Sequence, residues 1–355
     1  MAERKLFKGN EAVAEAAVRA GCRFFFGYPI TPQNEIPEYM SRRLPEVGGV
    51  FLQAESEVAA INMVYGAAGA GARVMTSSSS PGISLKQEGL SYIAGAELPC
   101  LVVNMVRGGP GLGGIQPAQS DYFQAVKGGG HGDYHLIVFG PASVQEMVDL
   151  VMGSFDIAEK YRTPVMILGD GIIGQMMEPV EFPEPLPGPF PKGDWVTDGA
   201  RGRAPRVINS LSLHADKLFE RNLRIAARFE EAKKNEVRVE TIACEDADVV
   251  LVAYGTTARI CKSVVDRARA EGIRAGLVRP ISLSPFPEKT IFDLAARKPV
   301  FLAVEMSQGQ MVEDVRLSVN GRADVRFYGT SGGVIPSASA ILDKVRELAR
   351  SEVRA

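Results

Sequence analysis

The sequence has little of what metal centres, membrane spans and nucleic-acid surfaces require. Its 355 residues include three histidines and four cysteines, and no two cysteines form a C-x-x-C pair. Zinc or iron–sulfur ligation within this chain is therefore not expected. No apolar run reaches the roughly 18–20 residues that a membrane-spanning helix needs. Forty basic residues against forty-two acidic ones leave a formal charge of −2, which predicts neither a nucleic-acid surface nor a polybasic membrane anchor.

The few sulfur and imidazole side chains have ordinary explanations. The four cysteines are far apart and mostly in apolar stretches, which predicts buried, reduced thiols. His131 and His135 are four residues apart, but the glycines around them indicate a loop, and we expect no metal site there. No signal-peptide apolar stretch follows Met1–Lys5, so a cytoplasmic location is expected.

What the sequence does contain is an α/β pattern that occurs twice. Short apolar strands alternate with helical segments from residue 10 to 168 and again from 248 to 349, which predicts parallel sheets with helices on both faces. Between them, residues 178–205 are rich in proline and predict an extended connector. We therefore expect two doubly wound domains, residues 1–240 (connector included) and 245–355.

Polar residues follow several of the predicted strands, where parallel sheets bind ligands. Tyr28-Pro29-Ile30-Thr31 follows a buried strand, and the prolines hold the Thr31 hydroxyl in an extended segment. Thr31 could instead cap the next helix. The serine run 76–80 could likewise cap a helix or offer hydroxyl and N–H groups to a ligand.

An acidic pair ends one predicted strand and opens a helix. Glu55 and Glu57 flank Ser56, and the residues after Glu57 are apolar. A carboxylate in a first helical turn can merely complement the helix dipole, with Ser56 as the cap. Burial, however, raises the pKa of a carboxyl group, and a buried protonatable glutamate suits proton transfer.

Arg107 ends another strand and opens a glycine-rich loop. Its guanidinium could grip a carboxylate ligand, or it could be a surface arginine paired with an acid. The G-x-G-x-x-G at Gly109–Gly114 is not followed by a helical pattern, so a nicotinamide site is disfavoured. Gly169-Asp170-Gly171 begins like a diphosphate–magnesium motif, but no asparagine follows at residues 192–201, and a tight turn is expected instead.

Taken together, these stretches resemble the α subunit of the 2-oxoacid:ferredoxin oxidoreductases, branched-chain type, which acts on 2-oxoisovalerate (3-methyl-2-oxobutanoate). The resemblance runs in order over nearly the whole chain. The matching segments are Gly27–Pro32, Gln53–Glu57, Thr76–Gly82, Val106–Pro110, Gly128–Asp133, Val278–Ile281 and Glu305–Gln310.

The resemblance implies a pyrimidine-binding domain followed by a transketolase C-terminal-like domain. It implies thiamine diphosphate at a subunit interface, with Glu57 (or Glu55, if the alignment slips by two residues) as the catalytic acid at N1′ of the aminopyrimidine. Thr31 and Arg107 match substrate-binding positions. The other expected cofactor-binding residues are Tyr28, Pro29, Ile30, Ser79 and Ser80.

The resemblance assigns the missing parts to partner chains. A β subunit would carry the diphosphate–Mg²⁺ site and a cluster. A γ subunit and a ferredoxin-like subunit would complete the complex, with further iron–sulfur clusters, coenzyme A as cosubstrate and external ferredoxin as acceptor. Leu112–Ser120 has no arginine or lysine, which favours an apolar substrate tail. The same reaction on 2-oxoglutarate, pyruvate or an aromatic 2-oxoacid, and a non-catalytic scaffold, remain as alternatives.

Overall fold

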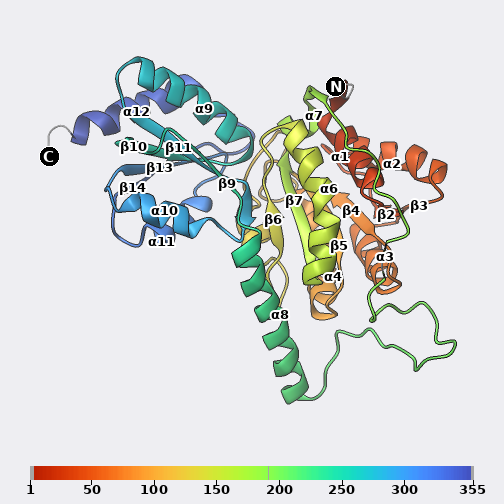
Figure 1. Cartoon of the computed structure of the whole chain (residues 1–355). Coiled ribbons are helices and arrows are strands. Elements are labelled where there is room, and N and C mark those ends of the chain that lie inside the picture. Colours follow the sequence, from red (N-terminus) through yellow and green to blue (C-terminus); the bar gives the residue numbers. More distant parts are fainter. Residues whose placement is uncertain (1–3, 191, 353–355) are drawn as a thin grey trace.

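The computed structural model describes residues 4–190 and 192–352 and contains two large β-sheets, each covered by helices, and a small two-stranded sheet (Figure 1). Strands of the first part of the chain are β1 (Lys5–Lys8), β2 (Phe24–Gly27), β3 (Val50–Gln53), β4 (Val74–Ser78), β5 (Cys100–Val106), β6 (Ile137–Phe139), β7 (Pro164–Asp170) and β8 (Met177–Val180). Its helices are α1 (Gly9–Arg19), α2 (Glu35–Glu46), α3 (Glu57–Gly69), α4 (Ser80–Gly95), α5 (Tyr122–Val126), α6 (Val144–Tyr161) and α7 (Gly171–Gln175).

The second part of the chain repeats the pattern after a long helix. Its strands are β9 (Val239–Ile242), β10 (Val249–Val252), β11 (Ala275–Pro280), β12 (Ser282–Ser284), β13 (Val300–Glu305) and β14 (Val325–Gly329). Its helices are α8 (Ala215–Asn235), α9 (Gly255–Ala270), α10 (Glu288–Ala295), α11 (Met311–Val319) and α12 (Ala338–Glu352). The expected α/β class with two wound domains is confirmed.

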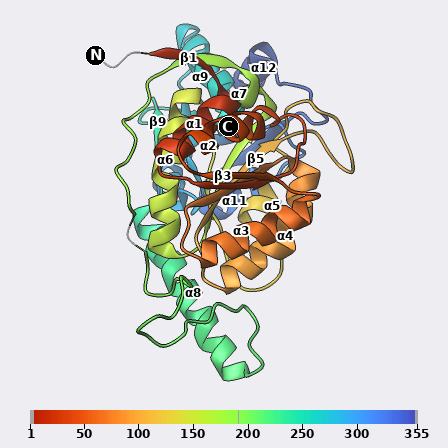
Figure 2. The same ribbon diagram turned by 90° about the vertical axis from the view of Figure 1, so that its right-hand side faces the viewer.

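The first sheet has the strand order β12-β6-β7-β5-β4-β2-β3, and its strands from β6 to β3 run parallel. Side chains alternate between its faces, as the period of two requires. Val103 packs with α1, α2 and α6 on one face, whereas Val102 packs with α3 and α4 on the other. Figure 2 shows these two helical layers on either side of the strands.

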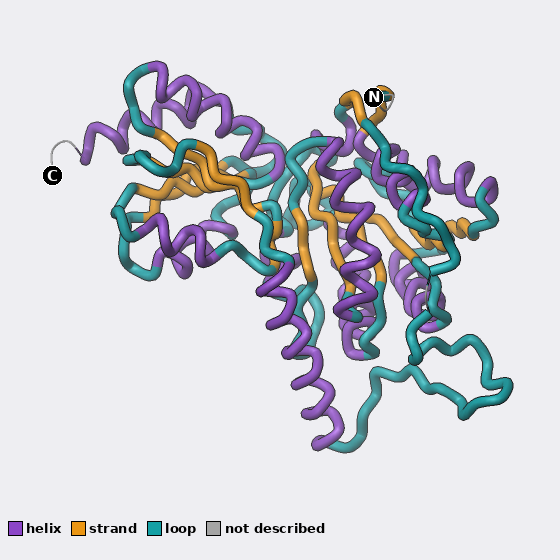
Figure 3. Tube along the Cα trace, in the orientation of Figure 1, coloured by secondary structure: helices purple, strands orange, loops and turns teal. Residues whose placement is uncertain are grey.

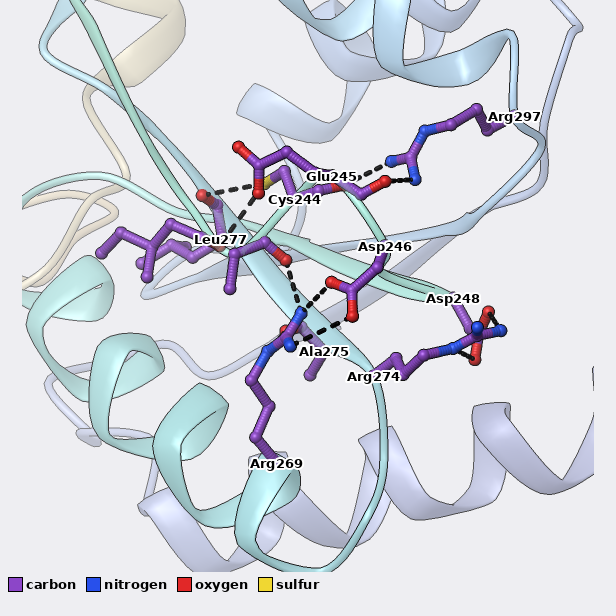
Figure 4. A network of polar contacts seen from close by, with 11 residues as sticks. Cys244, Glu245, Asp246, Asp248, Arg269, Arg274, Ala275, Leu277 and Arg297 are labelled. Atoms are coloured by element: carbon purple, nitrogen blue, oxygen red, sulfur yellow. Dashed lines mark hydrogen bonds and ion pairs between the residues drawn. The ribbon is translucent and has the colours of Figure 1, made fainter.

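The second sheet has the order β14-β13-β10-β11-β9 and is parallel except for β9. Helices α9 and α12 cover one face, and α10 and α11 cover the other. A polar network lies at the amino-terminal ends of β10 and β11. In Figure 4, Arg269 pairs with Asp246 (2.6 Å) and Arg297 donates to the backbone carbonyls of Cys244 and Glu245.

Each large sheet has an antiparallel edge strand that the sequence pattern did not predict. Strand β12 pairs antiparallel with β6 in the first sheet, and β9 pairs antiparallel with β11 in the second. Strand β12, from the expected second domain (245–355), therefore belongs to the first sheet, and β9 straddles the expected end of the first domain (1–240). Arg279 of β11 links the second sheet to the helices of the first. It donates two hydrogen bonds of 2.8 Å to Glu146 of α6, and it also pairs with Glu240.

Most of the proline-rich segment lies between β8 and α8. The described residues of this connector form no helix or strand, and both the connector and α8 project from the body of the molecule (Figure 3). The four cysteines are all free and buried, and burial raises the pKa of the Cys244 thiol to about 11. In the part of the chain that is described, no helix has the length and apolar character needed to cross a membrane.

Candidate active site

The candidate residues gather at one edge of the first sheet because four parallel strands end there. Strands β5, β4, β2 and β3 are consecutive in the sheet and run parallel. The segments that leave their carboxyl ends carry Thr31, Glu57, Ser79 and Arg107. The placement of ligand-binding residues at this edge is the general arrangement of open α/β sheets.

Glu57 is the first residue of α3 and is buried, with 5% of its surface exposed, whereas Glu55 is exposed. Ser56 is the N-cap of this helix, and its Oγ accepts a hydrogen bond from the Ala59 N–H at 3.2 Å. Among the described residues, none donates a hydrogen bond to the Glu57 carboxylate. The geometry therefore separates the two glutamates: one lies in solvent, and the other is a buried acceptor without a donor.

A cradle of small residues surrounds this carboxylate. A Cβ placed on Gly82 would lie 2.4 Å from Glu57 Oε1 and 2.1 Å from Ser78 Oγ, so any larger residue there would displace these side-chain groups. The hydroxyls of Ser78 and Ser79 are buried and have no hydrogen-bond partner. Ser79 is the N-cap residue of α4, yet its side chain makes no capping bond.

Ser80 is used differently from Ser79. Its Oγ accepts a hydrogen bond from the Arg107 N–H (3.1 Å) and donates one to the Arg107 carbonyl (3.2 Å). Its N–H donates to Asn104 Oδ1 at 3.2 Å. The Ser80 side chain thus fixes the backbone of the arginine, while the neighbouring hydroxyl of Ser79 stays free.

Arg107 is buried, with 7% of its surface exposed, and no carboxylate of the described chain pairs with it. Its Nη1 donates to the Thr31 carbonyl at 2.9 Å and its Nη2 to the Leu112 carbonyl at 3.0 Å. A guanidinium has five N–H donors, and here Nε has no partner. The alternative of a surface arginine paired with an acid does not describe this residue.

Thr31 lies beside this arginine in a turn, and it does not cap the following helix. The N-cap of α2 is Asn34, whose Nδ2 donates to Thr31 Oγ1 at 3.4 Å. That bond leaves the proton of the Thr31 hydroxyl free to donate. Tyr28 and Pro29 are exposed and Ile30 is half-buried, so this segment forms an outer rim near Arg107.

The two weak motifs have no ligand-binding geometry. The loop Gly109–Gly114 is followed by seven residues without a helix before α5, which is not the strand–loop–helix context of a dinucleotide site. Asp170 is fully buried and accepts hydrogen bonds from the N–H groups of Ile172 (2.8 Å) and Ile173 (3.2 Å), so it caps α7. The described residues hold no group of three or more potential metal ligands.

One residue of the site escaped the sequence reading. Lys86 lies on α4 one turn after Gly82, is fully buried, and its Nζ has no hydrogen-bond partner. The sequence does contain a signal for it, because the charged Lys86 lies on the same buried face of α4 as Ile83 and Leu90. A lysine on such a stripe is seldom buried without a charged partner.

Two family models match the two halves of the chain. Residues 15–187 match the model described as pyruvate flavodoxin/ferredoxin oxidoreductase, thiamine diP-bdg, and residues 247–341 match the model of pyruvate:ferredoxin oxidoreductase core domain II. Every candidate residue above lies in the first region. Together with the fold, these matches define the class of thiamine-diphosphate-binding 2-oxoacid oxidoreductases.

Similar proteins of known activity make this more specific. The ketoisovalerate oxidoreductase subunit VorB of Methanothermobacter marburgensis is 52% identical over 97% of this chain and 98% of its own length. The 2-oxoglutarate synthase subunit KorA of Methanothermobacter thermautotrophicus is 36% identical over 99% of this chain and 100% of its own. The chain therefore belongs to the 2-oxoacid:ferredoxin oxidoreductase family, which confirms the family and the enzyme class expected from the sequence.

Solved structures agree with this assignment. The 2-oxoglutarate:ferredoxin oxidoreductase from Magnetococcus marinus with 2-oxoglutarate, coenzyme A and succinyl-CoA bound has a TM-score of 0.88 at 28% identity. The alignment covers 98% of this chain and 66% of that one. A split-gene transketolase, with a TM-score of 0.60 at 15% identity, matches in fold over 97% of this chain.

Proposed function

We propose that this chain is the α subunit of a branched-chain 2-oxoacid:ferredoxin oxidoreductase and that its site receives the aminopyrimidine half of thiamine diphosphate. The complex converts 2-oxoisovalerate and coenzyme A to acyl-CoA, CO₂ and reduced ferredoxin. The observation that carries this proposal is the buried Glu57 carboxylate, which no donor of the described chain satisfies. A buried carboxylate without a partner is costly, and a ligand that brings a proton to it removes that cost.

The residues around Glu57 fit such a ring. Gly82 leaves room beside the carboxylate, and the Ser79 hydroxyl offers a free donor and acceptor. Tyr28, Pro29 and Ile30 form the rim from which the ring can be covered, and Ser80 contributes by fixing the Arg107 backbone. Thiamine diphosphate, when bound, supplies the nucleophilic carbon and the electron sink for decarboxylation.

The role of Glu57 follows from hydrogen-bond chemistry. An ionised carboxylate only accepts hydrogen bonds, and the lone pair of a pyrimidine nitrogen also only accepts. The two can bond only if a proton lies between them. We therefore assign Glu57 the task of holding a proton at N1′ of the ring, in a cradle that keeps bulk water away from it.

Arg107 and Thr31 are assigned to the substrate. The guanidinium has N–H groups to spare, Nε among them, and lacks a protein carboxylate, so the carboxylate of a 2-oxoacid supplies the missing partner. The free proton of the Thr31 hydroxyl suits the keto oxygen. The hydrogen bond from Arg107 to the Thr31 carbonyl places the two groups side by side.

The remaining chemistry is assigned to partner chains. The described residues contain no group of three or more potential metal ligands, and the Asp170 carboxylate caps a helix. We propose that a β subunit holds the diphosphate and Mg²⁺ and carries a cluster. A γ subunit and a ferredoxin-like subunit complete the electron path to external ferredoxin, which accepts one electron at a time.

Replacing Gly82 by alanine tests the cradle. The added methyl group has no space, because Glu57 Oε1 and Ser78 Oγ lie within 2.4 Å of its position. We expect thiamine diphosphate to bind at least about tenfold more weakly, which corresponds to about 1.4 kcal/mol. Calorimetric titration of the apo complex measures this. Gly95→Ala is the matched control on the same helix, because its nearest neighbour lies 3.6 Å away, and it should leave the affinity unchanged.

The preference for an apolar substrate tail is assigned to the loop after Arg107. Leu112 is held next to the arginine through its own carbonyl, and its side chain is 81% exposed in this chain. Ile115 is exposed in the same loop, and neither it nor Leu112 has a basic neighbour between residues 108 and 120. An apolar side chain of a substrate gripped by Arg107 would meet this surface, whereas a second carboxylate would find no cation there.

Comparing substrates tests the assignment of the tail. With a viologen acceptor, we expect kcat/KM on 2-oxoisovalerate to exceed that on 2-oxoglutarate by at least about tenfold, pyruvate and phenylpyruvate being compared in the same series. Leu112→Arg should narrow or invert the ratio by supplying the missing cation. Equal rates on both acids, or a ratio that this variant leaves unchanged, would remove the loop from substrate selection.

A further inference from the structure

Among the described residues, Lys86 differs from the other basic ones because it is wholly buried and its Nζ has no hydrogen-bond partner. It lies in the middle of α4, with none of its surface exposed, and its Nζ makes no hydrogen bond. Transferring an ammonium group into such a place is costly unless an opposite charge compensates for it. The location of that opposite charge indicates what the lysine does.

The packing of α3 on α4 brings Lys86 and Glu57 to the same interface. Gly82 and Gly89 let the helices approach, because Glu57 fills the space over Gly82 and Ile61 fills the space over Gly89. Lys86 follows Gly82 by four residues, so both face α3. Glu57 and Ile61 have the same spacing on the opposing helix.

Glu57 is the one charge that acts on this ammonium from the described elements packed around it, which are α3, β5, β7 and α8. Burial lowers the pKa of Lys86 to about 8, and the charge of Glu57 opposes that fall. The ammonium therefore keeps its proton at neutral pH. The two groups form neither a hydrogen bond nor an ion pair, so Lys86 acts on Glu57 through its field and not by transferring a proton.

We infer that Lys86 is a positioning residue that keeps Glu57 ionised in the cofactor-free site, so that the proton held at the pyrimidine ring is taken up from solvent when thiamine diphosphate binds. The inference rests on the proposed function, because it concerns the same glutamate. An opposite charge nearby favours the ionised carboxylate, whereas burial alone favours its protonated form.

Proton linkage gives the expected behaviour of the wild-type complex. If binding takes up about one proton, the affinity for thiamine diphosphate weakens by up to about tenfold for each unit of rising pH. Calorimetry in buffers of different ionisation enthalpy counts the protons directly. Between about pH 5.5 and 7 about nine-tenths or more of the ammonium stays charged, so this range isolates the effect.

Lys86→Met removes the charge and keeps an unbranched side chain of similar length. We expect the proton uptake to fall to about half or less, and the pH dependence of the affinity to flatten, because loss of a nearby charge moves carboxyl titration by about 1–3 pH units. Lys86→Gln should behave in the same way, which guards against a folding defect in the first variant. Lys86→Arg keeps the charge and should keep the pH dependence.

A matched control separates charge from packing. Gln87 is the next residue of the helix, is buried, and both of its amide atoms lack a partner. Gln87→Met should leave proton uptake and its pH dependence as in the wild type. The melting temperature of Lys86→Met should not fall, since a buried unpaired ammonium has been removed.

Two outcomes distinguish this inference from the proposed function. If Glu57→Gln is inactive but both neutral Lys86 variants keep the wild-type proton uptake and pH dependence, the role of Lys86 is refuted and the function stands. If Glu57→Gln remains active and binds the cofactor normally, the proposed function itself fails. Flattened pH dependence in both neutral variants, with Gln87→Met and Lys86→Arg unchanged, supports the inference.

Discussion

Glu57→Gln in the assembled complex is expected to lower kcat for coenzyme-A-dependent 2-oxoacid oxidation by about 10²–10⁴-fold, the range of a positioned acid–base group. The glutamine side chain is nearly isosteric, and its amide cannot exchange a proton with the ring. Because no protein donor bonds to the Glu57 carboxylate, the change breaks no internal hydrogen bond of the described chain. Subunit assembly should therefore be retained, whereas thermal stability should fall moderately, because the buried Lys86 loses the one charge that offsets its burial.

Glu55→Gln provides the control for this result. Glu55 lies two residues earlier, is exposed, and belongs to the same acidic pair. Its replacement should leave turnover within about twofold of the wild type, as is usual for surface substitutions. Near-normal turnover in Glu57→Gln would take the proton-holding role from Glu57, and a scaffold function for the chain would then explain the site better.

Arg107→Met is expected to reduce kcat/KM for the 2-oxoacid by about 10²–10³-fold. Removing one partner of a buried, charge-assisted pair costs about 2–5 kcal/mol, and here the other partner is the substrate carboxylate. Steady-state kinetics over a wide range of 2-oxoacid concentrations measure the loss. The effect should be present for every 2-oxoacid, because all of them carry the 2-keto acid group.

Two further variants show whether Arg107 acts on the substrate or only on the loop. The arginine also binds the carbonyls of Thr31 and Leu112, so Arg107→Lys keeps a charge but loses the fork that reaches both. We expect Arg107→Lys to be intermediate. Lys127→Met, at a lysine paired with Asp314, should change kcat/KM little. If Arg107→Met binds thiamine diphosphate as tightly as the wild type, its loss of kcat/KM comes from the interaction with the substrate.

The parallel core of both sheets could be predicted from the sequence because each strand is a short apolar run between helical segments. Helix α6 is one of these segments, and its capping Ser143 accepts a hydrogen bond from the Glu146 N–H at 3.1 Å. Local signals of this kind depend on neighbouring residues only. They are therefore readable without the tertiary structure.

The pairing of the short edge strands could not be predicted in the same way. Strand β12 is three residues long, Ser282–Ser284, and its pairing with β6 is decided by contacts more than 140 residues away in the sequence. The two-stranded sheet of β1 and β8 likewise joins opposite ends of the first part of the chain. Short polar strands have no apolar alternation of their own to mark them.

The candidate site could likewise be predicted only in part. That Thr31, Glu57 and Arg107 would meet follows from parallel strands, whose carboxyl ends share one edge. Which glutamate is buried was undecided in the sequence, and the packing of Glu57 on Gly82 decides it. Lys86 was overlooked because its importance comes only from the close approach of α3 and α4. The assignment of these residues to cofactor and substrate stays a prediction.

A structure of the complete complex with thiamine diphosphate bound tests the central claim most directly. The account predicts that the aminopyrimidine nitrogen lies within hydrogen-bond distance of the Glu57 carboxylate, beside Gly82, while the diphosphate and its magnesium ion rest on another subunit. A ring bound away from Glu57, or a cofactor held entirely by this one chain, would contradict it.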